Sequence, residues 1–391
     1  MTRRCRVLHT TTIFPLSSGA AESTKLTLNL LDRSRFEPFL ATAPGQSMDA
    51  EVAPDVVRIP LRRLRRPINP IADLSVLVEI YGAIRRFGFD AVHTHNAKDG
   101  IVGRWAAHFA GTSAIVHTIH NVSFEASASN IVNGHYAMQE RWAARITDRL
   151  LAVSAANSAK YLRRGIGRPE QYRILYSGLD LARYNDDGRP AAVRRAQLGL
   201  PTRPGPWVGW LGRFNRQKDP LTFVRAAHLV SARLPSAQFI VCGDDPLDES
   251  LEGQTRALAS ELGLSDAMHF VGFQRDVANI LRSVDIMMHS SRYEGMGRLI
   301  CEALACERPV AGTAVDGVVE VIESGRRGGI LAPPGDAPAL ATATVQLLTD
   351  TAFARALASS GHRWVVQHLS AERMVQGIEE VYLGLLDRRQ T

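Results

Sequence analysis

The chain has 391 residues, of which 45% are hydrophobic and 22% are charged, a composition ordinary for a soluble globular protein. At roughly 100 to 200 residues per domain, this length predicts two domains. Four scattered cysteines without CxxC spacing argue against a disulfide framework or a zinc site, and no apolar run reaches the roughly 18 residues of a membrane span. We interpret MTRRCRVLHTTTIF at the start as a first strand and not as a signal peptide.

The net charge of +7 is unevenly distributed. Residues 1–185 hold 24 basic and 15 acidic residues, a net +9, while the rest holds 22 and 24, a net −2. A local peak lies at Arg62, Arg63, Arg65 and Arg66. This pattern favours an anionic partner, namely a phosphorylated acceptor, an anionic membrane surface or a nucleic acid. A solvated arginine-rich face would explain the cluster equally well.

Short apolar runs alternate with amphipathic runs in the first half. The predicted strands are residues 5–11, 36–43, 56–61, 90–95, 114–120, 150–154 and 173–178. The predicted helices are residues 22–31, 74–87, 99–110, 138–147 and 158–164. Strands that alternate with helices in this way indicate a parallel sheet covered by helices on both faces.

Residues 183–206 are punctuated by Pro and Gly around a short helix, and we expect the domain junction there. The second half repeats the alternation. Its predicted strands are residues 207–213, 238–243, 268–273, 285–290, 309–314 and 328–333. Its predicted helices are residues 220–231, 255–262, 277–283, 299–305 and 318–324, with further helices to the end. The fold class is therefore α/β, with two Rossmann-like doubly wound domains, and ligands are expected in a cleft beyond the carboxyl ends of the strands.

Two motifs in the second half suit a sugar nucleotide. Arg213 and Lys218 follow a predicted strand in a loop that opens a helix, where two cations suit a diphosphate, although surface cations near a turn would look the same. In SSRYEGMGRLICEAL, Glu294 and Glu302 flank two glycines and a helix start. Free N–H groups at a helix start favour an anion, and carboxylates accept hydrogen bonds from sugar or ribose hydroxyls.

Other strand ends give weaker signals. Asp316-Gly317 ends a strand and opens a helix with Glu320 in its first turn, where an acidic residue is also a plain capping device, and the loop Ser18-Gly19-Ala20 leaves room for a substrate. Four histidines end strands: His93, His95, His117 and His120. Without Cys or carboxylate partners in sequence, they are more typical of neutral hydrogen-bonding groups than of zinc ligands. His120 falls where a strand opens into a loop and is expected to face the cleft.

At this point the motifs resemble glycosyltransferase family four, whose members are retaining enzymes of the GT-B fold. The resemblance rests on GRFNRQKDP, CGDDP, HFVGF, VDIMMHSSRYEGMGRLICEALACERPVAGTAVDGVVEVI and GGILAPPGD, and in the first half on VHTHNAKDGIVGRWAAHFAG, VHTIHNVSF, RWAARITDRLLAVS and ILYSGLD. The motifs cover nearly the whole chain, and the first half is similar to enzymes of bacterial exopolysaccharide and capsule assembly.

The resemblance implies a role for each matching residue. Glu294 would lie at the donor sugar, Glu302 would hold the ribose, Arg213 and Lys218 would neutralise the diphosphate, and His120 would contact the donor sugar at the reaction centre. We therefore expect His120, Arg213, Lys218 and Glu294 to be catalytic. The other donor-binding residues expected are Gly19, Phe273, Val277, Gly295, Met296, Gly297, Arg298, Leu299 and Glu302. The acceptor-side candidates are Ser18, Gly19, His95 and Lys98.

The implied reaction is a same-face displacement in which the leaving phosphate oxygen takes the acceptor proton. The protein then positions the reactants and stabilises charge, without a cofactor or a metal. Asp244 and Asp245 only superficially offer a metal-binding DxD pair. The sequence departs from the family pattern at His289, where proline is common, at Ser177, at Glu307 and in the early loop SSGAAES. The altered early loop puts the identity of the acceptor in doubt.

We expect a retaining glycosyltransferase that uses a UDP- or GDP-sugar and a glycan or lipid-linked acceptor in bacterial surface polysaccharide synthesis. It would be cytoplasmic, with peripheral contact at an anionic inner membrane face, and would not bind nucleic acid. Alternatives are a transferase acting on a small secondary metabolite, a nucleotide-sugar epimerase, or a nucleic-acid binder suggested by the pI of about 9.5. We expect a first domain of residues 1–185, a second of residues 186–369, and a helix at residues 370–391 that packs back on the first.

Overall fold

The computed structural model describes residues 3–12, 14–16, 18–64, 70–122, 124, 129–244 and 250–388. Arg65, Arg66 and Asp245, which the sequence analysis singled out, lie outside the described residues. The chain divides into two compact units. The first comprises the residues up to Leu179 and those from Leu369 onward, and the second comprises Asp180–His368. The boundary therefore falls six residues before the position expected from the Pro- and Gly-rich stretch.

The first unit is built on a seven-stranded parallel sheet in the order β3-β2-β1-β4-β5-β6-β7. Its strands are β1 (Cys5–Thr11), β2 (Phe36–Thr42), β3 (Val57–Pro60), β4 (Ala91–His95), β5 (Ala114–Ile119), β6 (Arg149–Ala152) and β7 (Tyr172–Ile174). The central strands are buried on both faces, which is typical of parallel sheets covered by helices. The chain reverses its direction of winding between β1 and β4.

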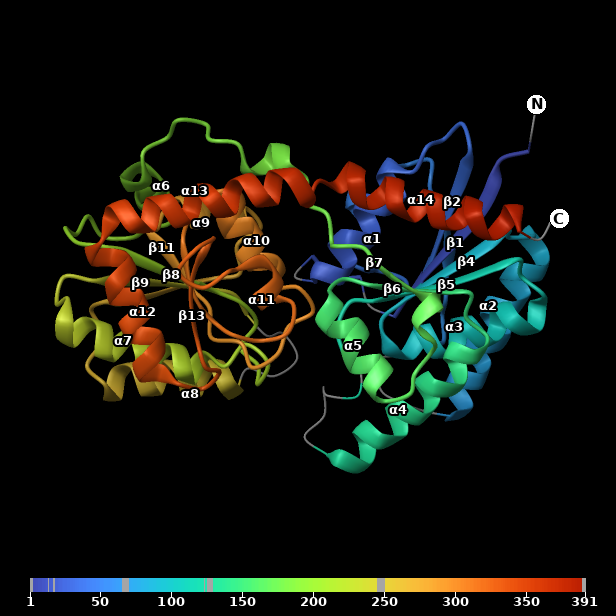
Figure 1. The fold of residues 1–391 in the computed structure, drawn as a ribbon, viewed down its shortest axis with the longest axis horizontal. Helices are drawn as coiled ribbons and strands as arrows, with labels where there is room; N and C mark the ends of the chain where they lie inside the picture. Colours follow the sequence, from blue (N-terminus) through green and yellow to red (C-terminus); the bar gives the residue numbers. More distant parts are fainter. Residues whose placement is uncertain are drawn as a thin grey trace. The chain divides into compact units, whose positions relative to one another are not determined.

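Helices cover both faces of this sheet (Figure 1). Their bounds are α1 (Gly19–Leu30), α2 (Pro70–Phe87), α3 (Ala97–Ala110), α4 (Asn130–Arg145), α5 (Ala155–Arg163) and α14 (Ala371–Asp387). One hydrophobic cluster joins α1 and α14 to one face, and another joins α2 and α3 to the other. Serine side chains at Ser18, Ser129, Ser154 and Ser370 accept a backbone N–H in the first turn of their helices, which fixes where those helices begin.

The C-terminal helix α14 belongs to the first unit although it is the last element of the chain. The N–H of Leu179 donates to the carbonyl of Leu369 at 2.7 Å, and that of Ala371 returns to Leu179 at 2.9 Å. A Cβ at Gly178 would lie 2.6 Å from the Cα of Ala371, so only glycine allows this close approach. The helix therefore places Tyr382 at the sheet, in a cluster with residues of β1, β4 and β5.

The second unit contains a six-stranded parallel sheet in the order β10-β9-β8-β11-β12-β13. Its strands are β8 (Trp207–Leu211), β9 (Gln238–Cys242), β10 (Met268–Gly272), β11 (Ile286–Met288), β12 (Val310–Thr313) and β13 (Gly329–Ala332). Its helices are α6 (Ala191–Gln197), α7 (Pro220–Arg233), α8 (Ser250–Glu261), α9 (Val277–Arg282), α10 (Arg298–Ala305), α11 (Val318–Val321), α12 (Ala337–Thr349) and α13 (Thr351–His368). The main hydrophobic core of this unit packs α7 and α12 on one face of the sheet. Figure 1 shows α9, α10 and α13 on the other face.

The predicted α/β class with two doubly wound parallel sheets is confirmed, and every predicted strand is present. The largest local difference concerns α4, which begins at Asn130 and not at residue 138. Its first turns contain Val132, Asn133 and Gly134, which have low helix propensity. The cap at Ser129 allows the helix to begin there nevertheless. Among the described helices, none is long and apolar enough to cross a membrane.

Candidate donor site and histidine cluster

The charged donor-site candidates of the second unit lie on two segments that follow neighbouring strands of the sheet. The first loop follows β8 and carries Arg213 and Lys218, and the second follows β11 and leads through Glu294 to α10. Strands β8 and β11 are neighbours, and the order of winding reverses between them. In doubly wound sheets this switch point is where ligands bind, because the flanking loops diverge and leave a crevice. The fold thus brings together residues 76 apart in sequence.

Glu294 is the centre of this arrangement. Its Oε1 accepts hydrogen bonds from Lys218 Nζ at 2.5 Å, Ser291 Oγ at 2.7 Å and His289 Nε2 at 3.2 Å. The side chains of Lys218 and Glu294 are 15% and 8% exposed, so the ion pair is mostly shielded from water. The carboxylate is consequently held in one position by three donors from two loops.

The electrostatics keep Glu294 ionised. Burial alone would raise the pKa of Glu294, but the Lys218 ammonium and the hydrogen bond from His289 together hold that pKa well below its ordinary value. Burial lowers the pKa of His289 despite the neighbouring carboxylate. Neutral His289 therefore donates to Glu294 through Nε2, and the site presents an anionic acceptor beside one ammonium.

The loop after Glu294 leads into α10 through two glycines, Gly295 and Gly297. Gly297 precedes the helix with φ +78°, and a Cβ there would lie 3.0 Å from Val318 Cγ2. The backbone N–H of Glu294 donates to Asp316 at 2.9 Å, which fixes the loop from the β12 side. Met296 is buried, while Gly295, Arg298 and Leu299 complete the turn. The geometry is that of a helix start whose N–H groups can receive an anion.

Glu302 has a different environment, one turn into α10. It accepts from Arg298 Nε at 2.9 Å and is 8% exposed. Burial raises the pKa of Tyr184, as do the charge of Glu302 and a hydrogen bond to it. The segment that opens the second unit, Leu181–Tyr184, is thereby linked to α10.

Arg213 contrasts with Lys218. Its guanidinium is half-buried and has no hydrogen-bond or ion-pair partner in the part of the chain that the structure describes. A cation in the loop after β8 that has no carboxylate partner among the described residues is suited to a ligand anion. Two further donor-binding candidates lie after β10, where Phe273 is exposed and Val277 begins α9.

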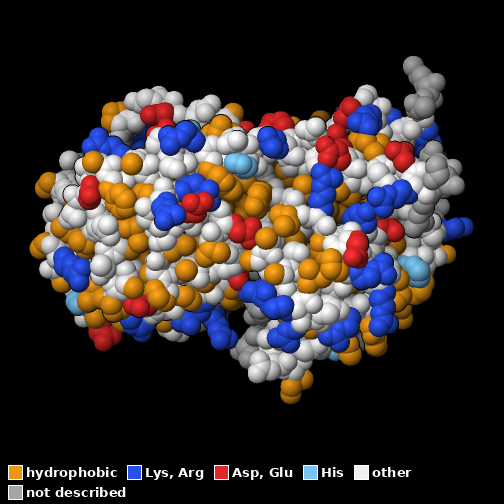
Figure 2. Space-filling model, viewed as in Figure 1, with side chains coloured by type: hydrophobic (Ala, Val, Ile, Leu, Met, Phe, Trp, Pro, Cys, Tyr) orange, Lys and Arg blue, Asp and Glu red, His pale blue; other side chains and the backbone are white. Residues whose placement is uncertain are grey.

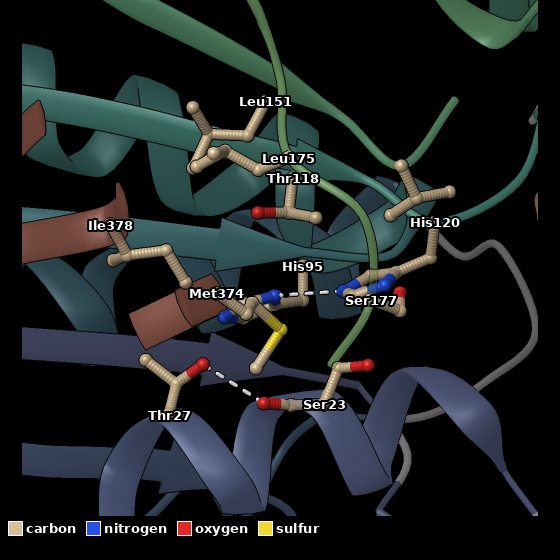
Figure 3. A pocket seen from close by; sticks show the side chains of 11 residues that line it. Ser23, Thr27, His95, Thr118, His120, Leu151, Leu175, Ser177, Met374 and Ile378 are labelled. Atoms are coloured by element: carbon tan, nitrogen blue, oxygen red, sulfur yellow. Dashed lines mark hydrogen bonds between the residues drawn. The ribbon is translucent and has the colours of Figure 1, made fainter. Parts of the chain in front are cut away.

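In the first unit, the strand-end histidines form one buried cluster. His120 and His95 line a pocket with residues of α1, β5, β6 and α14, and their rings are joined by a 3.0 Å hydrogen bond between His95 Nδ1 and His120 Nε2 (Figure 3). Within the described residues, nitrogens of His9, His93 and His95 lie within 4.8 Å of one another. Each ring nitrogen of these three histidines already has a hydrogen-bond partner in the cluster.

The acceptor-side candidates are not all accessible. His95 is buried beneath His120, and Lys98 pairs with Asp73 at 2.6 Å with 10% of its side chain exposed. Neither side chain is presented to solvent, because the former packs into the sheet and the latter is drawn to a carboxylate of α2. Ser18 caps α1, accepting from Ala21 at 3.3 Å, and Gly19 is the first residue of that helix.

Sequence reasoning missed several residues at these sites. His289 was noted only as a departure from the family pattern, and that departure was the available signal for its contact with Glu294. Ser291 and Asp316 stood in recognised segments without an assigned role. His9 and Tyr382 gave no signal, because their contact joins residues 373 apart.

Two parallel-sheet Rossmann-like domains with this donor-site constellation define a glycosyltransferase of the GT-B fold. Residues 17–183 match the family model described as Glycosyltransferase Family 4, and residues 205–350 match the model described as Glycosyl transferases group 1. The chain belongs to glycosyltransferase family 4.

Known proteins similar to this chain agree with that assignment. Over 376 residues it is 25% identical to the Escherichia coli UDP-Gal:alpha-D-GlcNAc-diphosphoundecaprenol alpha-1,3-galactosyltransferase, covering 96% of both chains. It is 30% identical over 311 residues to the D-inositol 3-phosphate glycosyltransferase of Salinispora arenicola, covering 75% of this chain and 68% of that relative. The crystal structure of Anabaena HepE in complex with UDP and glucose superposes with a TM-score of 0.82 at 21% identity, covering 96% of this chain and 99% of HepE.

Proposed function

We propose that this protein is a retaining glycosyltransferase that moves a sugar from a UDP-sugar to a lipid-diphosphate-linked glycan in polysaccharide assembly. The observation that carries the proposal is the pairing of Lys218 with a buried, ionised Glu294 at a sheet switch point, on the loop that also carries Arg213, which has no side-chain partner among the described residues. The E. coli relative is named for a UDP-galactose donor and a diphosphoundecaprenol-linked acceptor, and HepE was solved with UDP and glucose. These names support the choice of donor and acceptor.

In the proposed mechanism, the diphosphate of the donor binds between Arg213, Lys218 and the start of α10. The two cations stabilise the charge that develops on the leaving phosphate. Glu294 accepts hydrogen bonds from donor-sugar hydroxyls, and Glu302 accepts from the ribose. The leaving phosphate oxygen takes the proton of the acceptor hydroxyl on the same face of the sugar, so that configuration is retained. His120 orients the sugar.

The proposal requires no divalent metal, since two side-chain cations neutralise the diphosphate. We expect UDP to raise the melting temperature of the protein equally with and without EDTA, while GDP and ADP leave it unchanged. A ligand at about 100 times its dissociation constant stabilises a protein by roughly 2.7 kcal/mol. Differential scanning fluorimetry with the three nucleotides measures this. A shift that requires added Mg²⁺ or Mn²⁺, or one given by GDP and not by UDP, contradicts the corresponding part of the proposal.

The acceptor is tested by transfer itself. We expect labelled sugar from a UDP-sugar to appear on a short-chain polyprenyl-diphosphate glycan and not on inositol phosphate. The Salinispora relative, named for D-inositol 3-phosphate, is the observation that favours a small soluble acceptor instead. Transfer to inositol phosphate alone would support that second candidate. The anomeric configuration of the product, read by NMR, tests retention.

A lipid-linked acceptor requires the protein to reach a membrane surface, and α4 offers a suitable face. Ile131, Met138 and Trp142 are exposed along this helix, with exposed fractions of 86%, 39% and 51%. Arg141 and Arg145 are exposed between and after them. Figure 2 shows Lys and Arg side chains gathered over α4 and α5, with hydrophobic side chains at the lower end of α4. Apolar and basic side chains on one exposed helix face favour an anionic lipid surface.

We therefore propose peripheral binding to anionic membranes from the cytoplasmic side. Vesicles containing phosphatidylglycerol should sediment the protein in a salt-sensitive manner, and pure phosphatidylcholine vesicles should not. Ile131→Ser with Trp142→Ser should weaken binding by about tenfold or more, because each side chain would lose its burial in lipid. Val366→Ser is the matched control, since Val366 is 46% exposed on α13 of the second unit. Equal binding by all variants would contradict the proposal.

A further inference from the structure

Six polar groups form one unbroken hydrogen-bonded chain through the first unit. His120 Nε2 meets His95 Nδ1 at 3.0 Å, and His95 Nε2 meets His9 Nδ1 at 3.0 Å. His9 Nε2 meets the hydroxyl of Tyr382 at 3.2 Å, and the same hydroxyl meets His93 Nδ1 at 2.5 Å. His93 Nε2 meets Thr118 Oγ1 at 2.7 Å and ends the chain. This hydrogen-bonded series thus crosses β1, β4 and β5 and includes a residue of helix α14.

The position of each group follows from the sheet. His9 pairs with His93 in the register of β1 and β4, and His95 pairs with Thr118 in the register of β4 and β5. Side chains of paired residues in neighbouring strands lie on the same face. Tyr382 reaches this face because α14 packs on it. The rings of His9 and His95, and those of His95 and His120, are stacked at 5.3 Å between centroids.

The inner rings of this chain are neutral. Burial lowers the pKa of His9 to about 3, and burial with the neighbouring histidines lowers the pKa values of His93 and His95 well below the ordinary value. A neutral imidazole has one N–H and one acceptor nitrogen. Each inner ring uses both nitrogens in the chain, so it must donate in one direction and accept from the other. The tautomers are therefore coupled, and the direction of one bond fixes the direction of all.

We assign the direction in which the Tyr382 phenol donates to His93 Nδ1, the 2.5 Å contact that is the shortest hydrogen bond of the series. With the phenol donating to His93 Nδ1, His93 Nε2 donates to Thr118. His9 Nε2 then donates to the phenol oxygen, His95 Nε2 donates to His9, and His120 Nε2 donates to His95. His120 is thereby the Nε2–H tautomer, with Nδ1 as its acceptor nitrogen.

We infer that His95, His9 and Tyr382 are positioning residues that fix the ring orientation and the tautomer of His120 through this chain. The inference rests on the proposed function in one respect, namely that His120 acts on the donor sugar. A ring held as one tautomer presents an acceptor at one position, whereas a ring that exchanges tautomers presents an acceptor at Nδ1 only part of the time. Because Tyr382 lies on α14, the C-terminal helix contributes to the geometry of the reaction centre.

A metal ion among His9, His93 and His95 is the competing explanation of the cluster. Their nitrogens are close enough, but a bound ion would have to replace hydrogen bonds that already satisfy every ring nitrogen. The coupled chain explains the cluster without an added group. One equivalent of zinc retained by the purified protein, measured by plasma emission spectrometry, would overturn our inference.

The direct test observes the histidine nitrogens of the full-length protein. With ¹⁵N-labelled histidine, the two-bond ¹⁵N–¹H couplings report which nitrogen of His120 carries the proton, and the His120→Asn spectrum assigns its signals. We expect the Nε2–H tautomer alone in the parent protein and a mixture of tautomers in Tyr382→Phe. Tyr172→Phe is the matched control, because its hydroxyl donates to the Ile166 carbonyl at 2.7 Å outside the chain. A mixture in the parent protein, or an unchanged tautomer in Tyr382→Phe, would overturn the inference.

Kinetics provide the second readout. Tyr382→Phe should lower kcat by about tenfold with little change of KM for the donor, as is typical when an outer partner of a functional histidine is lost. Thr94→Val is the control for the loss of a buried hydroxyl group, because the hydroxyl of Thr94 forms a 2.8 Å hydrogen bond with His117 on the opposite face of the sheet. Since the NMR result does not depend on catalysis, a tautomer change without loss of turnover contradicts the role assigned to His120 and leaves the coupled chain intact. Loss of turnover with an unchanged tautomer contradicts the chain.

Discussion

Replacing Glu294 with glutamine is expected to reduce sugar transfer by about 100- to 1,000-fold while the protein stays folded. The carboxylate accepts from Lys218, Ser291 and His289 through a single oxygen, which leaves Oε2 for a substrate hydroxyl. An amide of the same size places an NH₂ group where one of these oxygens stands. This NH₂ group is itself a donor, so it repels the Lys218 ammonium or the donating sugar hydroxyl that it faces. The substitution also removes the charge that Lys218 neutralises.

The measurement is initial-rate transfer from the UDP-sugar, together with the melting temperature with and without UDP. We expect UDP to bind Glu294→Gln about as well as the parent protein, because the proposed mechanism assigns the diphosphate contacts to Arg213, Lys218 and the start of α10. The control is Glu323→Gln, which removes an exposed carboxylate paired with Arg327 at 3.0 Å in the same unit. Parent-like turnover of Glu294→Gln would remove Glu294 from the proposed mechanism.

The sequence was sufficient to predict the elements that place Glu294. The alternation of apolar runs identified all the strands, and the glycines after Glu294 identified the start of α10. The loop after β8 and the loop after β11 were both recognised from charge and spacing. What brings them together is the strand order, in which β8 and β11 are neighbours although β9 and β10 intervene in sequence. That adjacency follows from the doubly wound topology and not from local pattern.

Partners across long sequence separations could not be predicted. A histidine in place of a proline at residue 289 signals a departure from the family pattern, but it does not identify Glu294 as the partner, because the contact through Nε2 forms only in the folded loop. Lys98 looked like an acceptor-side cation, but Asp73 of α2 lies within 2.6 Å of it. The hydrogen-bonded series of histidines depends on Tyr382. The helix that carries Tyr382 reaches the sheet only after the polypeptide has passed through the whole second unit. Such contacts depend on packing geometry, which a single sequence does not encode locally.

The largest effect on stability is expected at a buried ion pair that joins two helices of the first unit. Arg104 of α3 donates from Nη2 to Glu140 of α4 at 2.6 Å, and both side chains are fully buried. Arg104→Met would leave the Glu140 carboxylate without its cation in a site closed to water, and removing one partner of such a pair costs about 3–5 kcal/mol. For a domain of this size we expect the melting temperature to fall by roughly 10 °C.

The double variant Arg104→Met with Glu140→Met tests whether the loss comes from the unpaired charge. Replacing both charges with apolar side chains of similar length should restore most of the stability, since the desolvation cost disappears together with the attraction. Within the described residues, Arg104 Nη1 has no hydrogen-bond partner. The desolvation of this guanidinium nitrogen is therefore not offset by a hydrogen bond in the parent protein. Thermal denaturation of the four proteins of this cycle gives the coupling between the two residues.

The outcome of this double-mutant cycle also bears on the proposed membrane binding, because Glu140 lies on α4. This helix presents Ile131, Met138 and Trp142 to solvent, and Glu140 is the charged residue on its opposite, buried face. If Arg104→Met loosens α4, vesicle binding should weaken together with stability, and the double variant should recover both. Recovery of stability without recovery of vesicle binding would show that the ion pair also orients the exposed face of α4, in addition to holding the helix in place. A double variant no more stable than Arg104→Met would contradict the explanation from the unpaired charge.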